Sequence, residues 1–254
     1  MSDEPIIQVR NLTAGYGGTV ILKDINFDVR AGEVFTILGG SGSGKSTLLK
    51  HMIGLQQPLG GSIVIDGTDI ATAAGDEQLA VLRKIGVAYQ SGALFGSMTI
   101  LSNIALVLEE FTDLPRDAIE VIAQMKLKAV GLQAAAYKMP AELSGGMRKR
   151  AAIARALALD PKILFLDEPS AGLDPITSAQ LDELVLELSR SLGVTFVIVT
   201  HELPSIFAVA DRAIMVDKET RTIIADGRPQ ELRDQSENPK VRQFFRRRQE
   251  KGSA

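Results

Sequence analysis

GGSGSGKST, residues 39–47, is the stretch that decides the fold, because it matches the phosphate-binding loop pattern G-x-x-x-x-G-K-[S/T]. Residues 33–38 before it read as a buried strand, and Leu48, Leu49 and Met52 after it recur at helical spacing until Gly54. Glycines allow a tight turn that aims backbone N–H groups inward at a helix N-terminus, where an anion is stabilised. Strand, glycine loop and helix therefore predict a polyphosphate site.

Every residue of this loop is a candidate contact for a nucleotide. Lys45 is expected to reach the outer phosphates, and the Ser46 hydroxyl to bind Mg²⁺. The alternative is a flexible glycine turn, since a chance match occurs in roughly 1 in 100 chains of this length. The flanking strand and helix favour the phosphate loop. The candidate residues are Gly39, Gly40, Ser41, Gly42, Ser43, Gly44, Lys45, Ser46 and Thr47.

The composition is that of a globular protein. The 254 residues are 45% hydrophobic and 23% charged, with no cysteine and a net charge of -3. Disulfides and cysteine metal sites are excluded, and the acidic balance argues against non-specific nucleic-acid binding. The acidic N-terminus lacks a secretory signal, so a cytoplasmic location is expected. The uncharged window 85–108 contains polar residues and glycines that argue against a membrane span.

Before the phosphate loop and shortly after it, the chain predicts an antiparallel layer. Alternating apolar residues indicate strands at 6–12, 20–29 and 61–67. Tyr16 falls in the turn 14–18 between the first two strands. Its ring is equally suited to stack on an adenine base or to pack on its own strand.

The middle of the chain predicts a helical insertion. A short helix and a strand at 85–89 lead to Gln90, and residues 100–143 change to helical periodicity. Leu114-Pro115 and Met139-Pro140 are the predicted breaks. The apolar positions assigned to its two main helices are Ile104, Leu108 and Phe111, then Ile119, Ile122 and Met125.

Two further segments of the sequence contain candidate functional residues. In Leu143-Ser144-Gly145-Gly146-Met147, Ser144 is expected to cap a helix, and Gly145 and Gly146 expose N–H groups to an anion; a merely capped helix is the alternative. The buried strand 163–166 then ends in Asp167 and Glu168. Asp167 can hold Mg²⁺ and Glu168 can orient or deprotonate a water, although such acids alone more often form a solvated turn.

The last third of the chain predicts two more strand ends and a basic tail. Asp174-Pro175 starts a helix, and the strand 194–199 ends at Thr200-His201, where His201 could contact a γ-phosphate and the carboxylate. His51, after the phosphate loop, is interpreted as structural. Strands at 212–216 and 222–226 precede the basic run 241–248, which could meet lipid headgroups or a partner, although most such runs are solvated helix faces.

In this order the motifs resemble the nucleotide-binding subunit of ATP-binding cassette (ABC) transporters over nearly the whole chain. The resemblance implies an α/β fold, a P-loop NTPase ABC cassette with a RecA-like core and an antiparallel β subdomain in 1–90 and 160–235. It also implies an inserted α-helical subdomain with the signature at 91–159, and a C-terminal basic tail at 236–254. The cofactors implied are ATP and Mg²⁺.

The same resemblance assigns roles to single residues. Glu168, His201 and Gln90 become catalytic, with Gln90 linking Mg²⁺ and water to the membrane subunit. Tyr16 becomes the adenine-stacking aromatic. A homodimer with two shared sites follows, closed over ATP by the partner's signature, with Asp174 at the seam. The implied signature residues are Ser144, Gly145 and Gly146, and the implied Mg²⁺ ligands are Ser46, Gln90 and Asp167.

Within this family, residues 90–95, 147–150 and 174–178 look like the Mla and Mce group of bacterial lipid transporters. That likeness implies phospholipid transport, a separate transmembrane permease, a lipid-binding Mce-domain envelope protein and a peripheral location on the cytoplasmic face of the inner membrane. A polar amino-acid importer and a non-transport ATPase regulating envelope remodelling or cell division remain alternatives. A nucleic-acid-binding cassette is disfavoured by length and charge, and a kinase or GTPase would not explain LSGGM.

Overall fold

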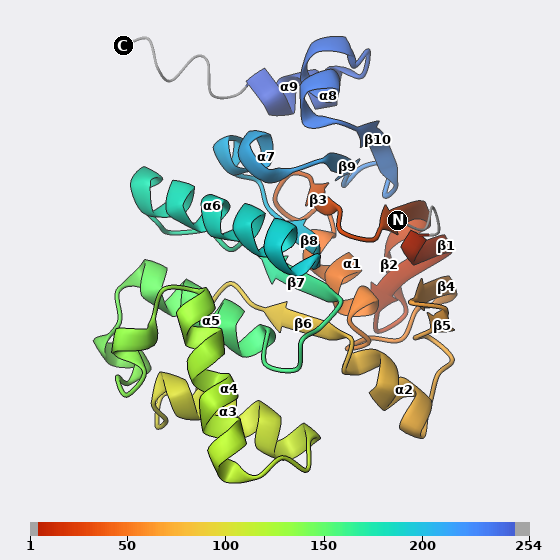
Figure 1. Cartoon of the computed structure of the whole chain (residues 1–254). Coiled ribbons are helices and arrows are strands. Elements are labelled where there is room, and N and C mark those ends of the chain that lie inside the picture. The colour runs from red at the N-terminus through yellow and green to blue at the C-terminus, as the bar shows by residue number, and fades with distance from the viewer. Residues whose placement is uncertain (1–4, 247–254) are drawn as a thin grey trace.

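The computed structural model describes residues 5–246, which form two sheets and a set of helices (Figure 1). The first sheet is antiparallel, in the order β2-β1-β4-β5, which confirms the predicted layer. Its first two strands are longer than predicted, so that Tyr16 is the last residue of a strand and only Gly17 and Gly18 form the turn. The strands are β1 (Pro5–Tyr16), β2 (Thr19–Arg30), β4 (Gly60–Ile65) and β5 (Thr68–Asp69).

The second sheet has the order β10-β9-β3-β8-β7-β6 and is parallel except for β10, which pairs antiparallel with β9. Its central strands β3, β8 and β7 are buried on both faces. In β7, Ile163 and Phe165 pack into one core while Leu164 and Leu166 pack into the other, which explains the unbroken apolar run. The strands are β3 (Val34–Leu38), β6 (Ile85–Ala88), β7 (Ile163–Asp167), β8 (Thr195–Val199), β9 (Arg212–Val216) and β10 (Ile223–Gly227).

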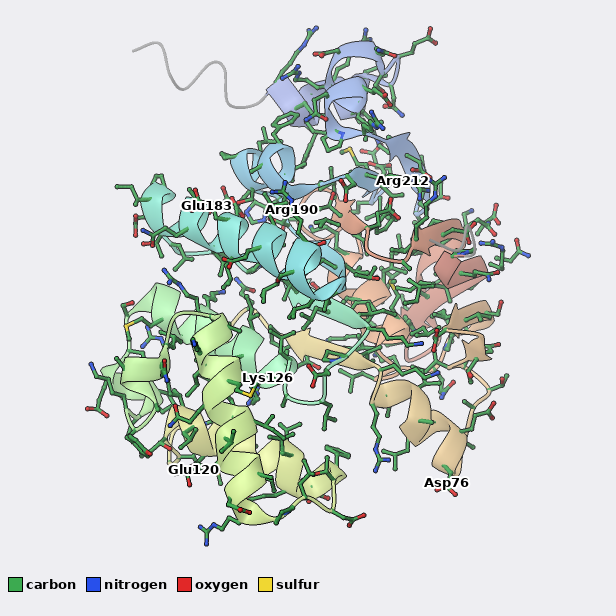
Figure 2. All side chains as sticks on the ribbon, viewed as in Figure 1. Asp76, Glu120, Lys126, Glu183, Arg190 and Arg212 are labelled. Carbon is green, nitrogen blue, oxygen red and sulfur yellow. The ribbon has the colours of Figure 1, made fainter. Side chains whose placement is uncertain are left out.

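The helices cover both faces of this sheet. The phosphate-loop helix α1 shares one core with both sheets, while α3, α4 and α5 group at the end of the molecule opposite α8 and α9 (Figure 1). Charged side chains such as Glu120 on α4 and Glu183 on α6 lie on the exposed helix faces (Figure 2). The helices are α1 (Lys45–Met52), α2 (Gly75–Leu82), α3 (Ile100–Phe111), α4 (Arg116–Ala129), α5 (Gly145–Ala156), α6 (Pro175–Leu192), α7 (Leu203–Val209), α8 (Pro229–Gln235) and α9 (Pro239–Arg246), with short 3₁₀ turns η1 (Gln133–Ala135) and η2 (Pro140–Glu142).

The predicted apolar face of α4 is wrong in one respect. Met125 is 63% exposed, and the helix instead buries Ile119, Ala123 and Leu127. These three residues are spaced by four, so they form one row along the helix, and the small Ala123 lets neighbouring helices approach closely. Phe111, at the end of α3, is also 37% exposed. The predicted break at Leu114-Pro115 is confirmed, because α4 begins at Arg116.

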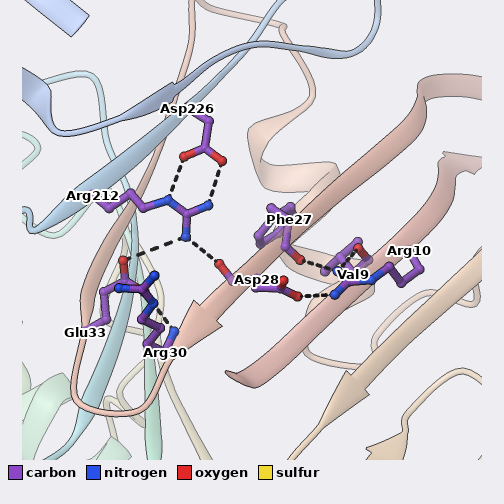
Figure 3. A network of polar contacts seen from close by, with 8 residues as sticks. All are labelled: Val9, Arg10, Phe27, Asp28, Arg30, Glu33, Arg212 and Asp226. Atoms are coloured by element: carbon purple, nitrogen blue, oxygen red, sulfur yellow. Dashed lines mark hydrogen bonds and ion pairs between the residues drawn. The ribbon is translucent and has the colours of Figure 1, made fainter. Parts of the chain in front are cut away.

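Arg212 joins the two sheets through a polar network (Figure 3). Its guanidinium makes a two-pronged ion pair with Asp226 of β10, at 2.6 and 2.7 Å, and donates to the Asp28 carbonyl of β2 at 2.9 Å. It also lies 5.4 Å from the centre of the Phe35 ring on β3. The antiparallel sheet is therefore fixed against the strand that leads into the phosphate loop.

The predicted basic run 241–248 is only partly a solvated face. Val241 and Phe245 of α9 are buried with Ile206 of α7 and Leu232 of α8, while Arg242 and Arg246 are exposed. Arg247 and Arg248 lie outside the described residues. Within residues 5–246, no helix is both long and apolar enough to cross a membrane.

Candidate functional site

The phosphate loop connects β3 to α1 in a conformation that requires glycine. Gly39 has a φ of 153°, and a Cβ there would lie 2.4 Å from Ser43 Oγ and 2.6 Å from the Val216 carbonyl oxygen. Gly44, with a φ of 98°, precedes the first residue of α1. The Lys45 ammonium donates to the carbonyls of Gly39 and Gly40 at 3.0 and 3.1 Å, so the lysine holds the loop's own backbone.

The loop lines a cavity of about 970 Å³ together with residues that follow three other strands. Gln90 follows β6, Glu168 follows β7 and His201 follows β8, and these strands lie in succession on one side of β3, in the order β3-β8-β7-β6. Ligands bind beyond the carboxyl ends of strands in such sheets, and this cavity has that position. The described lining residues are Gly39, Gly40, Ser41, Gly42, Lys45, Ser46, Gln90, Glu168, His201, Glu202, Leu203 and Phe244.

Glu168 is held in place from two directions. Its backbone adopts a left-handed φ of 47°, and its N–H donates to the Val199 carbonyl at the end of β8 at 2.8 Å. Its Oε1 lies 2.8 Å from His201 Nδ1, so the contact expected between histidine and carboxylate is present. A non-glycine residue in this conformation is uncommon, and functional sites are where such strain collects.

The carboxylates next to the loop suit a divalent cation. Asp167 Oδ1 and Glu168 Oε2 are buried without a hydrogen-bond partner among the described residues. Burial, and then the charge of Glu168, raise the pKa of Asp167, while Lys45 opposes the rise. No three His, Cys, Asp or Glu side chains converge on a metal within residues 5–246, so a cation here would need further oxygen ligands such as phosphate.

Lys149 is a site residue that the sequence analysis did not identify. From α5 its ammonium donates to the Gln90 carbonyl at 2.6 Å and to the Glu168 carbonyl at 3.2 Å. Burial lowers its pKa, and the charges of Asp167 and Glu168 oppose that shift. The sequence could have indicated this residue, because Lys149 lies four positions before the buried Ile153 and so on the inner face of α5. Leu203 and Phe244 were also not predicted to line the cavity.

Several predicted site residues are not among the described residues that line this cavity. The Ser144 hydroxyl accepts from the Met147 N–H at 3.2 Å and so caps α5, as predicted. Asp174 caps α6 by accepting from the N–H groups of Ile176 and Thr177 at 3.1 and 3.0 Å. Tyr16 is 57% exposed at the end of β1. Also outside the lining are Ser43, Gly44, Thr47, Gly145, Gly146 and Asp167.

Comparison with known families identifies this arrangement. The family model described as ABC transporter matches residues 22–171, which contain the phosphate loop, Gln90, Ser144 and Glu168. The chain belongs to the ABC transporter family. As predicted, it is an ATP-binding, ATP-hydrolysing subunit of an ABC transporter.

Curated relatives resemble the ABC subunit over most of its length. A "Probable ribonucleotide transport ATP-binding protein mkl" of Mycobacterium leprae is 43% identical, over 94% of this chain and 68% of that protein. An "Intermembrane phospholipid transport system ATP-binding protein MlaF" of Haemophilus influenzae is 40% identical, over 96% of this chain and 91% of that protein. The MlaF of Escherichia coli K12 is 41% identical, over 94% and 88%.

Solved ABC cassettes share the fold. CbiO1 of Clostridium perfringens, described as part of the ABC transporter complex cbiONQ, has a TM-score of 0.83 at 32% identity, covering 98% of this chain and 97% of that one. The ATP-binding cassette MJ0796, in a dimeric post-hydrolysis state bound to ADP and Pi, has a TM-score of 0.78 at 31% identity, covering 87% and 98%. The predicted α/β cassette fold is therefore confirmed.

Proposed function

We propose that this ABC subunit powers the transport of phospholipid or related hydrophobic molecules through a separate membrane permease. The observation that supports this substrate is the 40–41% identity to two MlaF proteins, whose length the chain covers to 91% and 88%. The second candidate is ribonucleotide transport, which the name of the 43% identical mycobacterial relative suggests. The chain covers less of that protein, 68%, and so accounts for less of it.

In the proposed hydrolytic site, the backbone N–H groups of the phosphate loop and Lys45 bind the phosphates. Ser46, Gln90 and Asp167 hold Mg²⁺, which neutralises charge on the phosphate oxygens when bound. Glu168 orients or deprotonates the attacking water. His201 fixes Glu168 and lies where it can contact the γ-phosphate.

The proposed assembly is a head-to-tail homodimer with two shared ATP sites. Ser144, Gly145, Gly146 and Asp174 are not among the lining residues of the chain's own cavity, which is what a site completed by a partner requires. Two ATP molecules then lie between the subunits. Loss of the γ-phosphate removes the contacts to the partner's signature, so hydrolysis favours the open dimer.

The proposed division of the chain follows these roles. Residues 1–90 and 160–235 form the RecA-like core with its antiparallel β subdomain, 91–159 form the helical subdomain, and 236–254 form the C-terminal tail. The helical subdomain passes the movement through Gln90 to the permease. An Mce-domain lipid-binding envelope protein completes the system, with this subunit peripheral on the cytoplasmic face of the bacterial inner membrane.

The hydrolytic role is tested with Glu168→Gln, which should keep ATP binding, lower turnover by roughly 100-fold or more and trap an ATP-bound dimer. Glu142→Gln, an exposed carboxylate near the signature, is the matched control. Size-exclusion chromatography and steady-state kinetics give the two readouts. Unchanged hydrolysis in Glu168→Gln would remove Glu168 from its role.

The shared site is tested with Ser144→Arg in the Glu168→Gln background. The bulky cation should block ATP-driven dimerisation but leave binding of one ATP per chain intact. Ser191→Arg adds the same charge at an exposed position near the end of α6 and should dimerise normally. If Ser144→Arg still dimerises with ATP, the shared-site proposal is wrong.

The substrate is tested by purifying the tagged chain from its native membranes in mild detergent and identifying co-purifying proteins and small molecules by mass spectrometry. A permease, an Mce-domain protein and bound phospholipid would support lipid transport. A permease with a nucleotide-binding receptor would favour the ribonucleotide candidate. A polar amino-acid receptor or a division protein would overturn both.

A further inference from the structure

His51 is a fully buried histidine whose ring contacts the backbone on both sides. It lies on α1, one residue before the last residue of that helix, and is 0% exposed. Its Nδ1 lies 2.9 Å from the carbonyl oxygen of Gln56. Its Nε2 lies 3.1 Å from the backbone nitrogen and 3.2 Å from the carbonyl oxygen of Gly15 on β1. The ring therefore bridges the segment after α1 and the end of the first strand.

These contacts fit a neutral ring with its proton on Nδ1. The Gln56 carbonyl can only accept, so His51 Nδ1 carries the proton and donates it. The Gly15 N–H donates to Nε2, which accepts as an unprotonated nitrogen; the Gly15 carbonyl oxygen at 3.2 Å would accept from Nε2 only in a ring protonated there. The neutral ring satisfies both partners. Burial also lowers the pKa of His51, which keeps the ring in this form.

Gly15 is part of a tight hairpin that ends beside Tyr16. A Cβ on Gly15 would lie 2.0 Å from the Thr19 carbonyl oxygen, so the two strands are in close approach at this point. Gly17 and Gly18 both have positive φ, at 55° and 77°, as a two-residue hairpin turn requires. Because this backbone has little freedom, the position of Gly15 determines the position of Tyr16.

The same helix that carries His51 also begins the phosphate site. Lys45 is the first residue of α1 and lines the cavity, and His51 lies six residues later. A rise of about 1.5 Å per residue separates them by roughly 9 Å along the helix axis. One rigid helix thus contacts the phosphate loop at one end and the Tyr16 hairpin near the other.

We propose that His51 is a positioning residue for nucleotide recognition: it fixes the Tyr16 hairpin relative to the phosphate loop, so that base and phosphates are bound at a set spacing. The inference rests on the proposed stacking of adenine on Tyr16. His51 acts through the Gly15 backbone and touches no nucleotide atom itself. Its loss therefore weakens recognition of the base and leaves recognition of the phosphates intact.

The test compares two ligands, ATP and inorganic tripolyphosphate, each titrated with Mg²⁺ into the full chain by calorimetry. His51→Leu replaces the imidazole with an apolar side chain of similar size and leaves the Gly15 N–H and the Gln56 carbonyl without this partner. It should weaken ATP binding about two- to tenfold and leave tripolyphosphate binding unchanged. His51→Gln offers an acceptor to Gly15 and should recover part of the ATP affinity. Met52→Leu, an equally buried neighbour on α1, is the matched control and should change neither.

The outcomes separate this inference from simple destabilisation. Equal weakening of both ligands by His51→Leu would show a general effect on the fold and overturn the inference, as would unchanged affinity for ATP. If His51→Leu fails to fold, His51→Gln decides: a loss confined to ATP supports the inference, and a loss shared by tripolyphosphate, or no loss, overturns it.

Tyr16→Ala separates the inference from the proposed function on which it rests. Loss of base stacking should weaken ATP about five- to 100-fold and leave tripolyphosphate unchanged. If Tyr16→Ala has no effect on ATP, the stacking role fails. If Tyr16→Ala weakens ATP and the His51 variants do not, stacking stands and only the role of His51 is refuted.

Discussion

Asp182→Asn should stabilise the protein, and by more at pH 8 than at pH 4.5. Asp182 lies on α6 and lines a cavity of about 490 Å³ between α6 and α7. Burial raises its pKa to about 6, against an ordinary value of 3.8, and a hydrogen bond from Ser205 on α7 only partly offsets the shift. The asparagine oxygen can accept the same hydrogen bond without carrying a charge.

The sign follows from comparing the folded and unfolded states. A carboxyl with a raised folded-state pKa holds its proton more tightly when folded, so stability is lost as the pH rises from about 4 to 6. The pKa difference converts to a ceiling of roughly 3 kcal/mol at about 1.4 kcal/mol per pH unit. Asp182 is only half-buried and water reaches the cavity, so we expect about 1 kcal/mol at pH 8.

Urea unfolding of the wild type and Asp182→Asn at pH 4.5, 6 and 8 measures the effect. Glu183→Gln is the matched control, because Glu183 is the next residue on α6 and is exposed (Figure 2). The free energy of unfolding of Glu183→Gln should not rise above that of the wild type by an amount that grows with pH. If Asp182→Asn raises the free energy of unfolding equally at all three pH values, or most at pH 4.5, then an ionised Asp182 does not destabilise the folded state.

Three other predictions follow from single contacts. Gly39→Ala should weaken Mg²⁺-ATP binding by at least about tenfold, because its Cβ would lie 2.4 Å from Ser43 Oγ, whereas Gly96→Ala, at an exposed glycine outside the cavity with nothing within 4 Å, should bind normally in the same titration. Lys149→Met should lower kcat about tenfold with little change in KM, since two hydrogen bonds to the catalytic loops are lost; a raised KM at normal kcat in steady-state assays would contradict this. Ala123→Lys should destabilise the fold in urea by about 2 kcal/mol or more, and the exposed Met125→Lys by less than about 0.5 kcal/mol.

Local rules were sufficient for the parts of the fold that the sequence predicted correctly. The glycine loop, the cap at Ser144, the helix start at Asp174 and the hairpin of β1 and β2 depend on residues close together in the chain. The face of α4 could not be settled this way. Rows through Ile119 and Ile122 or through Ile119 and Ala123 are both possible on one helix, and only packing against its neighbours selects the row with the smaller residue.

The sequence predicted those residues of the candidate site that belong to a motif and themselves line the cavity. Gln90, Glu168 and His201 line one cavity because β8, β7 and β6 lie side by side on one side of β3, and no single segment of the sequence determines that strand order. Arg212 illustrates the same limit, since its partners on β2 and β10 are set by how the sheets meet.

The contacts that support this site are made largely to backbone atoms. Lys45 binds the carbonyls of the phosphate loop, Lys149 binds the carbonyls of Gln90 and Glu168, and His51 binds the N–H of Gly15. Every residue type has a backbone carbonyl and every type except proline has an N–H, so a contact to these groups cannot be recognised from the sequence of the loop that it holds. Two subunits can therefore share every motif residue and still differ in how firmly the loops are held. Differences in turnover between such subunits should trace to positions equivalent to Lys149, and differences in ATP affinity to positions equivalent to His51.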